Sequence, residues 1–178
     1  ANDNTAFGSA ALYLNTTGTG NVAVGSGSLD ANTTGDYTVA VGRNALTAQT
    51  TGGNNTAVGD SALAANTTAS NNVGVGYAAL IANTTGANLV ALGGSALVAN
   101  TTGNSSVAIG YLALDANTTA SNNIAIGQHA VGTNTTGASN VGIGHEALYL
   151  NTTASNNTAV GFQSLRSNTT GTINTALG

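Results

Sequence analysis

The sequence predicts an all-β fold, a parallel β-solenoid (β-roll) of ten to eleven coils of 17 residues each. The main observation is a pattern with a fixed period: TAVGDSALAANTTASNN is followed by VGVGYAALIANTTGANL and then by VALGGSALVANTTGNSS. No insertion or deletion interrupts the count, and such a period is typical of repeat proteins. Place 1 of the repeat falls at Thr5, Val22, Val39, Thr56, Val73, Val90, Val107, Ile124, Val141, Thr158 and Thr175.

The composition of the chain fits an ordered repeat built from small residues. Of its 178 residues, 41% are apolar and 4% are charged, and proline, cysteine, methionine and tryptophan are absent. Disordered chains usually combine a high net charge with a low apolar content, and this chain has neither. Arg43 and Arg166 are the only Lys or Arg residues, and the net charge is −4. We therefore expect no nucleic-acid partner, since phosphates require a basic surface.

The organisation expected from this pattern is a single repeat array over residues 1–178 with no non-repeat domain. No apolar run approaches the roughly 18 residues of a membrane span, so we expect no membrane contact by this segment. We also expect no cofactor. Because solenoids usually end in capping units, the uncapped array is expected to be a segment of a longer fibre, or a subunit whose ends stack on neighbours.

Each place in the repeat predicts a local structure. Places 1–3 are an apolar triplet with a small middle residue, which is the period of a β-strand. Place 4 is glycine in all eleven copies, which permits a bend that a side chain would resist. Places 6–9, with leucine at place 8, predict a second short strand, and NTTG or NTTA at places 11–14 predicts a turn. Helical repeats are disfavoured because they need about 33 residues or more per unit.

Place 11 is asparagine in every copy but one. Equivalent residues of stacked coils lie about 4.8 Å apart, so these side-chain amides are expected to bond from coil to coil as a ladder. Gln49 keeps the amide, and the nine asparagines each begin an Asn-Thr-Thr glycosylation sequon. The predicted ladder consists of Asn15, Asn32, Gln49, Asn66, Asn83, Asn100, Asn117, Asn134, Asn151 and Asn168.

Place 2 is alanine or glycine in every copy. An open solvent face would also carry serine, lysine or glutamate, so uniform smallness predicts the close approach of another backbone. A 17-residue coil also has little room for a core of its own. Both points predict several chains packed along a common axis, and we expect three. The predicted close-packing row consists of Ala6, Ala23, Ala40, Ala57, Gly74, Ala91, Ala108, Ala125, Gly142, Ala159 and Ala176.

Variation concentrates at places 5, 6, 9, 10, 15 and 16, which are expected to be exposed. Because residues 17 apart should touch, Arg43 is predicted to pair with Asp60, and Arg166 to contact the Tyr149 ring. Aromatic side chains on a polar rod stack on sugar rings or anchor a protein partner. The candidate surface contacts are Tyr13, Tyr77, Tyr111, Tyr149 and Phe162.

One group contains residue types that catalysis or metal binding uses: His129 and Glu146 share place 6, and His145 lies beside Glu146. A site needs such groups convergent and held by their neighbours, whereas these belong to a face expected to be exposed. We therefore expect no catalytic or metal-binding residue, and not an enzyme. Paired threonines at places 12 and 13 suggest ice binding, but successive residues of an extended chain point to opposite faces, so at most one row is presented.

The repeats NTAVGxxAL…NTTGxxN resemble those of phage tail-fibre and bacterial surface-fibre proteins. The VAIG and VAVG cores also resemble the head repeats of trimeric autotransporter adhesins, in which the repeat is shorter. The resemblance covers essentially the whole chain. It implies a homotrimeric, parallel β-roll fibre that lies outside the cell, on the cell surface or on a virion.

The sequence thus predicts a structural extracellular fibre segment, the shaft or head of a surface or tail fibre, that spans distance and supports adhesion. One alternative is an adhesin module that binds glycan, matrix or a cell-surface receptor through places 5, 6 and 9. A second alternative is a homopolymer, in which the chain is a subunit of an end-to-end extracellular filament. Ice binding is a further, disfavoured alternative.

Overall fold

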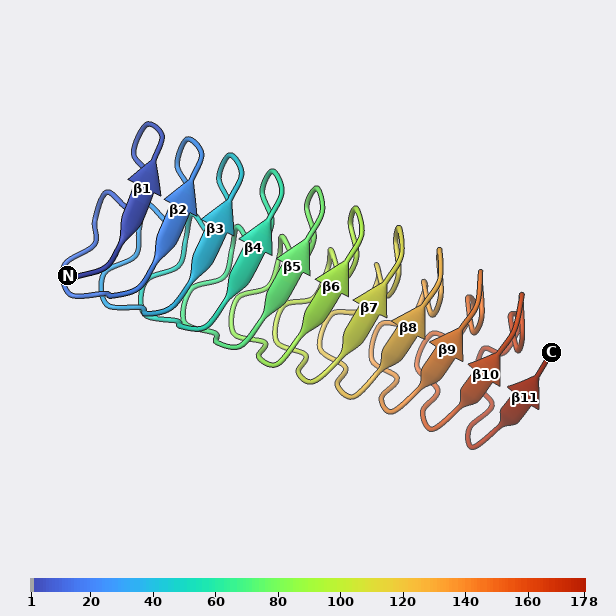
Figure 1. Cartoon of the computed structure of the whole chain (residues 1–178). Coiled ribbons are helices and arrows are strands. Elements are labelled where there is room, and N and C mark those ends of the chain that lie inside the picture. Colours follow the sequence, from blue (N-terminus) through green and yellow to red (C-terminus); the bar gives the residue numbers. More distant parts are fainter. Residues whose placement is uncertain (1) are drawn as a thin grey trace.

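The computed structural model describes residues 2–178 as one solenoid, in which every coil contributes a three-residue strand. The strands stack in chain order into a single parallel sheet (Figure 1). Pairing joins each strand residue to the one 17 positions later, as Val73 to Val90. The strands are β1 (Thr5–Phe7), β2 (Val22–Val24), β3 (Val39–Val41), β4 (Thr56–Val58), β5 (Val73–Val75), β6 (Val90–Leu92), β7 (Val107–Ile109), β8 (Ile124–Ile126), β9 (Val141–Ile143), β10 (Thr158–Val160) and β11 (Thr175–Leu177).

This architecture confirms the predicted fold class, an all-β parallel solenoid with coils of 17 residues. Ala1, the first residue of the predicted array, lies outside the described residues. Over residues 2–178, the chain forms no helix with the length and apolar character that crossing a bilayer requires.

Places 5–10 form turns, so the prediction of a second strand at places 6–9 was wrong. Residues at places 6 and 8 have positive φ angles, such as 58° at Ser61 and 53° at Leu63, whereas parallel strands need a φ of about −120°. Hydrogen bonds between coils nevertheless continue through this segment, because the Leu63 N–H donates to the Ala79 carbonyl oxygen at 2.9 Å. The repeat therefore has one strand and a long turn segment that is also stacked.

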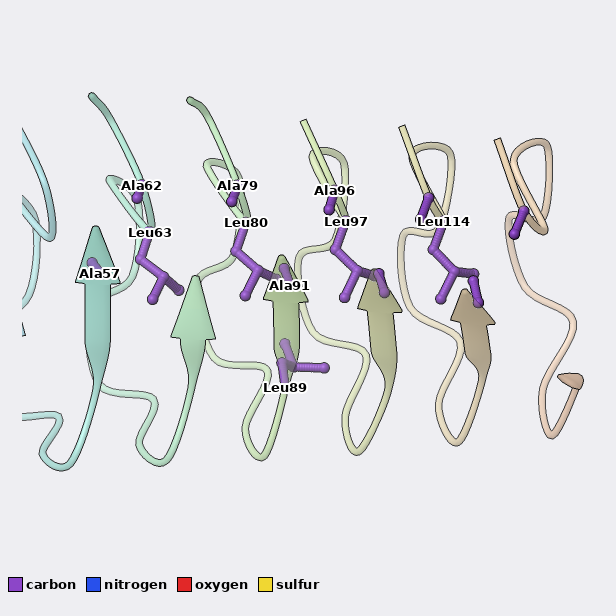
Figure 2. Close-up of a cluster of buried hydrophobic side chains, with 14 of the residues drawn as sticks. Ala57, Ala62, Leu63, Ala79, Leu80, Leu89, Ala91, Ala96, Leu97 and Leu114 are labelled. Carbon is purple, nitrogen blue, oxygen red and sulfur yellow. The ribbon is translucent and has the colours of Figure 1, made fainter. Parts of the chain in front are cut away.

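The apolar core lies between the strands and the turn segment of places 7 and 8. The leucines of place 8, such as Leu63, Leu80 and Leu97, are fully buried and point toward the strands (Figure 2). Alanines at places 2 and 7 fill the space around them without exposed surface, as Ala91 and Ala96 do. Burial of small and branched side chains in one continuous row along the rod supplies the hydrophobic stabilisation of the fold.

The place 2 row faces this core, so the prediction that it packs against another chain was wrong. Ala91 and Ala108 are completely buried within the single chain. At Gly74, an added Cβ would lie 3.3 Å from the Leu63 side chain and 3.4 Å from the Ala79 carbonyl oxygen. Place 2 is uniformly small because leucine and backbone of the same chain occupy the space, and places 1 and 3 consequently lie on the outer face.

Asparagine side chains fill the rest of the interior. At place 11, Asn83 Nδ2 donates to Asn66 Oδ1 at 3.1 Å and to the Gly86 carbonyl oxygen of its own coil at 2.9 Å. Equivalent side-chain bonds join each asparagine to the next from Asn66 to Asn168. Each amide in this ladder therefore ties one coil to its neighbour and also closes its own turn.

Gln49 continues this ladder on one side only. Its Oε1 accepts a hydrogen bond from Asn66 Nδ2 at 3.3 Å, but its Nε2 donates to Thr38 Oγ1 at 3.3 Å. Asn32 Oδ1 therefore receives no hydrogen bond and is buried without a partner. Because Gln49 keeps the amide oxygen, the ladder continues toward the C-terminus. Because its Nε2 bonds to Thr38 and not to Asn32, the ladder is interrupted toward the N-terminus.

A second amide row, at place 17, was not predicted. Asn72 Nδ2 donates to the Gly86 carbonyl oxygen of the next coil at 2.8 Å, and Asn72 Oδ1 accepts from the Leu89 N–H at 3.0 Å. The predominance of asparagine at place 17 was the available signal for this row. The same two bonds occur at Asn21, Asn55, Asn123, Asn140 and Asn157.

Candidate binding surface

The aromatic side chains suggested as surface contacts are mostly exposed. Tyr13, Tyr77, Tyr111 and Phe162 keep between 56% and 75% of their surface accessible, whereas Tyr149 is half-buried. The four coils of residues 107–174 hold three of these aromatic residues, both histidines of the chain and one of its two arginines. We call the group in residues 107–174 the aromatic patch, which consists of Tyr111, Asp115, His129, His145, Glu146, Tyr149, Phe162, Gln163 and Arg166.

His129 connects two tyrosines within the aromatic patch. Its ring meets the Tyr111 ring edge-on, with 6.0 Å between centroids, and meets the Tyr149 ring edge-on at 5.9 Å. These residues occupy places 5, 6 and 9 of successive coils, so their contacts run diagonally across the stack. Edge-to-face packing of rings is favourable, and it holds the three side chains in fixed positions.

Arg166 extends this chain of rings. Its guanidinium carbon lies 5.4 Å from the centroid of the Tyr149 ring, which confirms the predicted cation–π contact. Its Nε donates to Glu146 Oε2 at 2.6 Å, and Gln163 Nε2 donates to the same oxygen at 2.8 Å. The Arg166 hydrogen bond, followed by that of Gln163, holds the pKa of Glu146 below its usual value.

A second ring pair lies in the same coils. The imidazole of His145 stacks on the Phe162 ring, with 5.4 Å between centroids and 11° between planes. His145 Nδ1 is buried and has no hydrogen-bond partner. Phe162 remains 70% exposed, so its ring presents a surface that is supported from below by the histidine.

Asp115 lies near Tyr149 in this patch. Burial raises the pKa of its carboxyl group, and its Oδ1 has no hydrogen-bond partner. Gly132 separates Asp115 from Tyr149 in the place 9 row, and a Cβ there would lie 2.9 Å from the Tyr149 ring and 3.1 Å from Asp115 Oδ1. The missing side chain at Gly132 therefore lets the Tyr149 ring approach the carboxyl group.

The residues considered for metal binding or catalysis do not form one site. The Glu146 carboxylate accepts from Arg166 and Gln163, His129 packs between two tyrosines, and His145 stacks on Phe162. Across residues 2–178, no three His, Asp or Glu side chains gather closely enough to hold a metal ion. The same part of the chain encloses no pocket. What the patch offers is ring faces and hydrogen-bonding groups on an open surface.

The ion pair predicted between Arg43 and Asp60 is confirmed. Arg43 donates from Nη2 and Nε to Asp60 Oδ2 at 2.8 and 3.0 Å, and Ser61 Oγ donates to Asp60 Oδ1 at 2.7 Å. The Ser61 hydrogen bond, with Arg43 second, lowers the pKa of Asp60. The pair is exposed, so it marks the coil-to-coil register and adds little stability.

The two threonine rows differ in what their hydroxyl groups do. At place 12, hydroxyls donate to the backbone of the next coil, as Thr84 Oγ1 does to the Thr101 carbonyl oxygen at 3.0 Å. At place 13, side chains such as Thr85 and Thr102 are exposed. The solenoid therefore presents one row of free hydroxyls, as expected from the alternation of side chains.

Compared with protein-family models, with curated proteins and with solved structures, the chain matches none of them.

Proposed function

We propose that the chain is a structural segment of an extracellular fibre, and that it assembles as a parallel homotrimer. The observation that carries this proposal is the outer face of the sheet. From β2 to β10, places 1 and 3 hold only Val, Ile, Leu and Thr, and Val58 and Ile124 remain 36% and 37% exposed. An uncharged face of two apolar columns along a whole rod is typical of an interaction surface.

Further copies of the same chain suit this face because their coils have the same rise. Side chains from neighbouring copies would stay in register over about 50 Å, the length of ten coils at about 4.8 Å each. A partner with another spacing would lose register after a few coils. The resemblance to the heads of trimeric adhesins supports three copies about a common axis.

The interior supports a mechanical role in such a fibre. Backbone hydrogen bonds join successive coils, and the amide rows at places 11 and 17 join them again inside the rod. A satisfied polar network in a low-dielectric interior resists local opening. A rod held in this way spans distance without bending and exposes few unpaired backbone groups to proteases.

The test is the mass of the soluble assembly, measured by light scattering at two concentrations tenfold apart. We expect the mass of three chains at both concentrations. Replacing Val90 and Val107 with lysine places charges on the outer face, and we expect this double variant to have the mass of one chain. The matched control places lysine at Asn88 and Ser105, exposed residues of place 16, and should keep the mass of three chains.

Two results would contradict the trimer. A single-chain mass for the unmodified protein would show that the outer face has no partner copy. A mass that rises with concentration would show end-to-end association, and it would favour the filament alternative over the trimer.

A further inference from the structure

We infer that the aromatic patch is a binding site for a neutral linear oligosaccharide that lies along the rod across residues 107–174. This inference goes beyond the fibre proposal and does not depend on the number of chains in the assembly. The fibre would then carry a saccharide site at a defined position along the rod, and would not be the same over its whole length.

The first argument is the uneven distribution of side-chain chemistry. In residues 5–72, eight of the twelve residues at places 5, 6 and 9 are Ser, Ala, Gly, Asn or Thr, although the coil is the same, and the other four are Tyr13, Asp30, Arg43 and Asp60. Both histidines, three aromatic residues and Arg166 are gathered at these places in residues 107–174. Because the scaffold tolerates small polar residues there, the fold itself does not require these larger side chains.

The second argument is the support given to the exposed rings. Tyr111 is 56% exposed and rests edge-on against His129, and Phe162 is 70% exposed and rests on the His145 ring. Their coils are three steps apart, which corresponds to about 14 Å along the rod. A ligand that stacks on both rings must therefore be extended and several rings long. Rigid aromatic platforms bind with little loss of side-chain entropy.

The third argument is hydrogen bonding. Of the three buried side-chain atoms without a partner in residues 2–178, two belong to the patch, namely Asp115 Oδ1 and His145 Nδ1. Such atoms are rare in folded proteins and call for an explanation. Both atoms are shielded from solvent by the side chains above them. Sugar hydroxyls both donate and accept, so on the accessible surface they suit exposed groups such as the Gln163 amide, which lies beside ring faces.

The fourth argument is charge, which favours a neutral saccharide. Asp115 and Glu146 bring two carboxyl groups, and Arg166 brings one guanidinium that already bonds to Glu146. The charge of Arg166 is balanced by Glu146, so with both histidines neutral the patch has no net positive charge to attract a sulfate, a phosphate or a uronic acid. The open surface, without a pocket in residues 2–178, also suits a chain of sugar rings better than a small apolar molecule.

The experiment uses the two histidines as reporters, because the chain has no others and both lie in the patch. The full protein, labelled with ¹³C-histidine, is titrated with maltohexaose and with the β-1,4-linked hexamer of N-acetylglucosamine, and the imidazole signals are followed by NMR. We expect saturable shifts of both signals with at least one hexasaccharide. Binding of a heparin hexasaccharide should be at least tenfold weaker.

The matched variants are Tyr111→Ala and Tyr37→Ala. Tyr37 is 67% exposed, comparable with Tyr111 at 56%, but lies at place 16. We expect Tyr111→Ala to weaken binding at least tenfold and Tyr37→Ala to leave it unchanged. The proposal is overturned if neither hexasaccharide moves a histidine signal, if heparin binds more tightly, or if both variants weaken binding equally. A high-mannose glycoprotein provides a further check. If it shifts the histidine signals equally before and after its glycans are removed, the patch binds a protein partner and not a saccharide.

Discussion

Buried asparagines replace much of the hydrophobic core that a coil of 17 residues is too small to hold. At place 11 each Nδ2 from Asn66 to Asn168 donates twice, to a neighbouring amide and to a backbone carbonyl, as at Asn100. A buried polar group that loses its partner costs about 1–3 kcal/mol. Asn32 Oδ1, the one unpaired amide oxygen of this kind in residues 2–178, therefore marks a weak point in the rod.

We expect the double variant Gln49→Asn with Thr38→Asn to stabilise the fold by about 1–3 kcal/mol. Asparagine at position 49 returns a donor to Asn32 Oδ1, and asparagine at position 38 replaces the Thr38 hydroxyl that Gln49 now bonds. The measurement is thermal unfolding followed by circular dichroism. Thr38→Asn alone should give no gain because the longer Gln49 still occupies the space, and a lower melting temperature for the double variant would contradict the explanation.

The raised pKa of Asp115 predicts how stability depends on pH. Burial disfavours the charged carboxylate, so the folded state binds a proton at a higher pH than the unfolded state does. Asp115 therefore costs stability at neutral pH, and this cost disappears as the pH falls through the raised pKa. We expect Asp115→Asn to raise the melting temperature at pH 7, by a margin that shrinks toward pH 4. A margin independent of pH would rule out burial of the charge as its cause.

Among the elements of the coil, the bend after each strand imposes the strictest requirement on residue type. Place 4 glycines have φ near 130°, for example 136° at Gly93, a region that residues with a side chain rarely adopt. The bend turns the chain from the strand into the turn segment that carries Leu to the core. Its geometry is therefore needed in every coil for the strand and the leucine row to face each other.

We expect Gly93→Ala to destabilise the fold by at least about 1–3 kcal/mol from backbone strain alone. An added Cβ would also lie 2.6 Å from the Gly110 carbonyl oxygen of the next coil. The adjacent Gly94 is the control, since a Cβ there meets only the Tyr111 ring at an ordinary 3.5 Å. Chemical denaturation should separate the two variants, and similar midpoints would show that the bend tolerates a side chain.

At the scale of the whole molecule, the period alone predicted which residues stack, and this explains why the fold class and the Arg43–Asp60 pair were predicted correctly. A period does not indicate which side of each residue faces inward. Place 2 was therefore assigned to a neighbouring chain, although Leu63 of the same chain packs near this row. The positive φ of the leucines, which removes the second strand, has no signature in a hydrophobic pattern.

Seven of the nine residues of the aromatic patch were singled out from the sequence, whereas Asp115, Gln163 and most of the contacts within the patch were not. Residues 17 apart lie at the same place of adjacent coils, and this spacing predicted the contact of Arg166 with the Tyr149 ring. The Tyr111–His129–Tyr149 contacts cross from one place to another, so they depend on the path of the turn segment and on side-chain rotamers. Sequence spacing contains neither quantity.

The whole ladder makes a prediction about glycosylation. Nine place 11 asparagines begin sequons, yet both Nδ2 hydrogens are used inside the rod, as at Asn100. A glycan attached during synthesis would occupy the nitrogen before the coils close. We therefore expect expression through a eukaryotic secretory pathway to give little folded protein, and inhibition of N-glycosylation to restore it. Yield of protein with a cooperative thermal transition is the measurement.

The sequon also offers a control within the chain, because its required hydroxyl belongs to place 13. That hydroxyl is exposed in each coil, as at Thr85 and Thr102, whereas the ladder amide and the place 12 hydroxyl hold the structure. Valine at place 13 of all nine sequons should remove glycosylation, keep the ladder and restore folded protein in the secretory host. Continued misfolding of this unglycosylated variant would show that glycans on the ladder are not the cause.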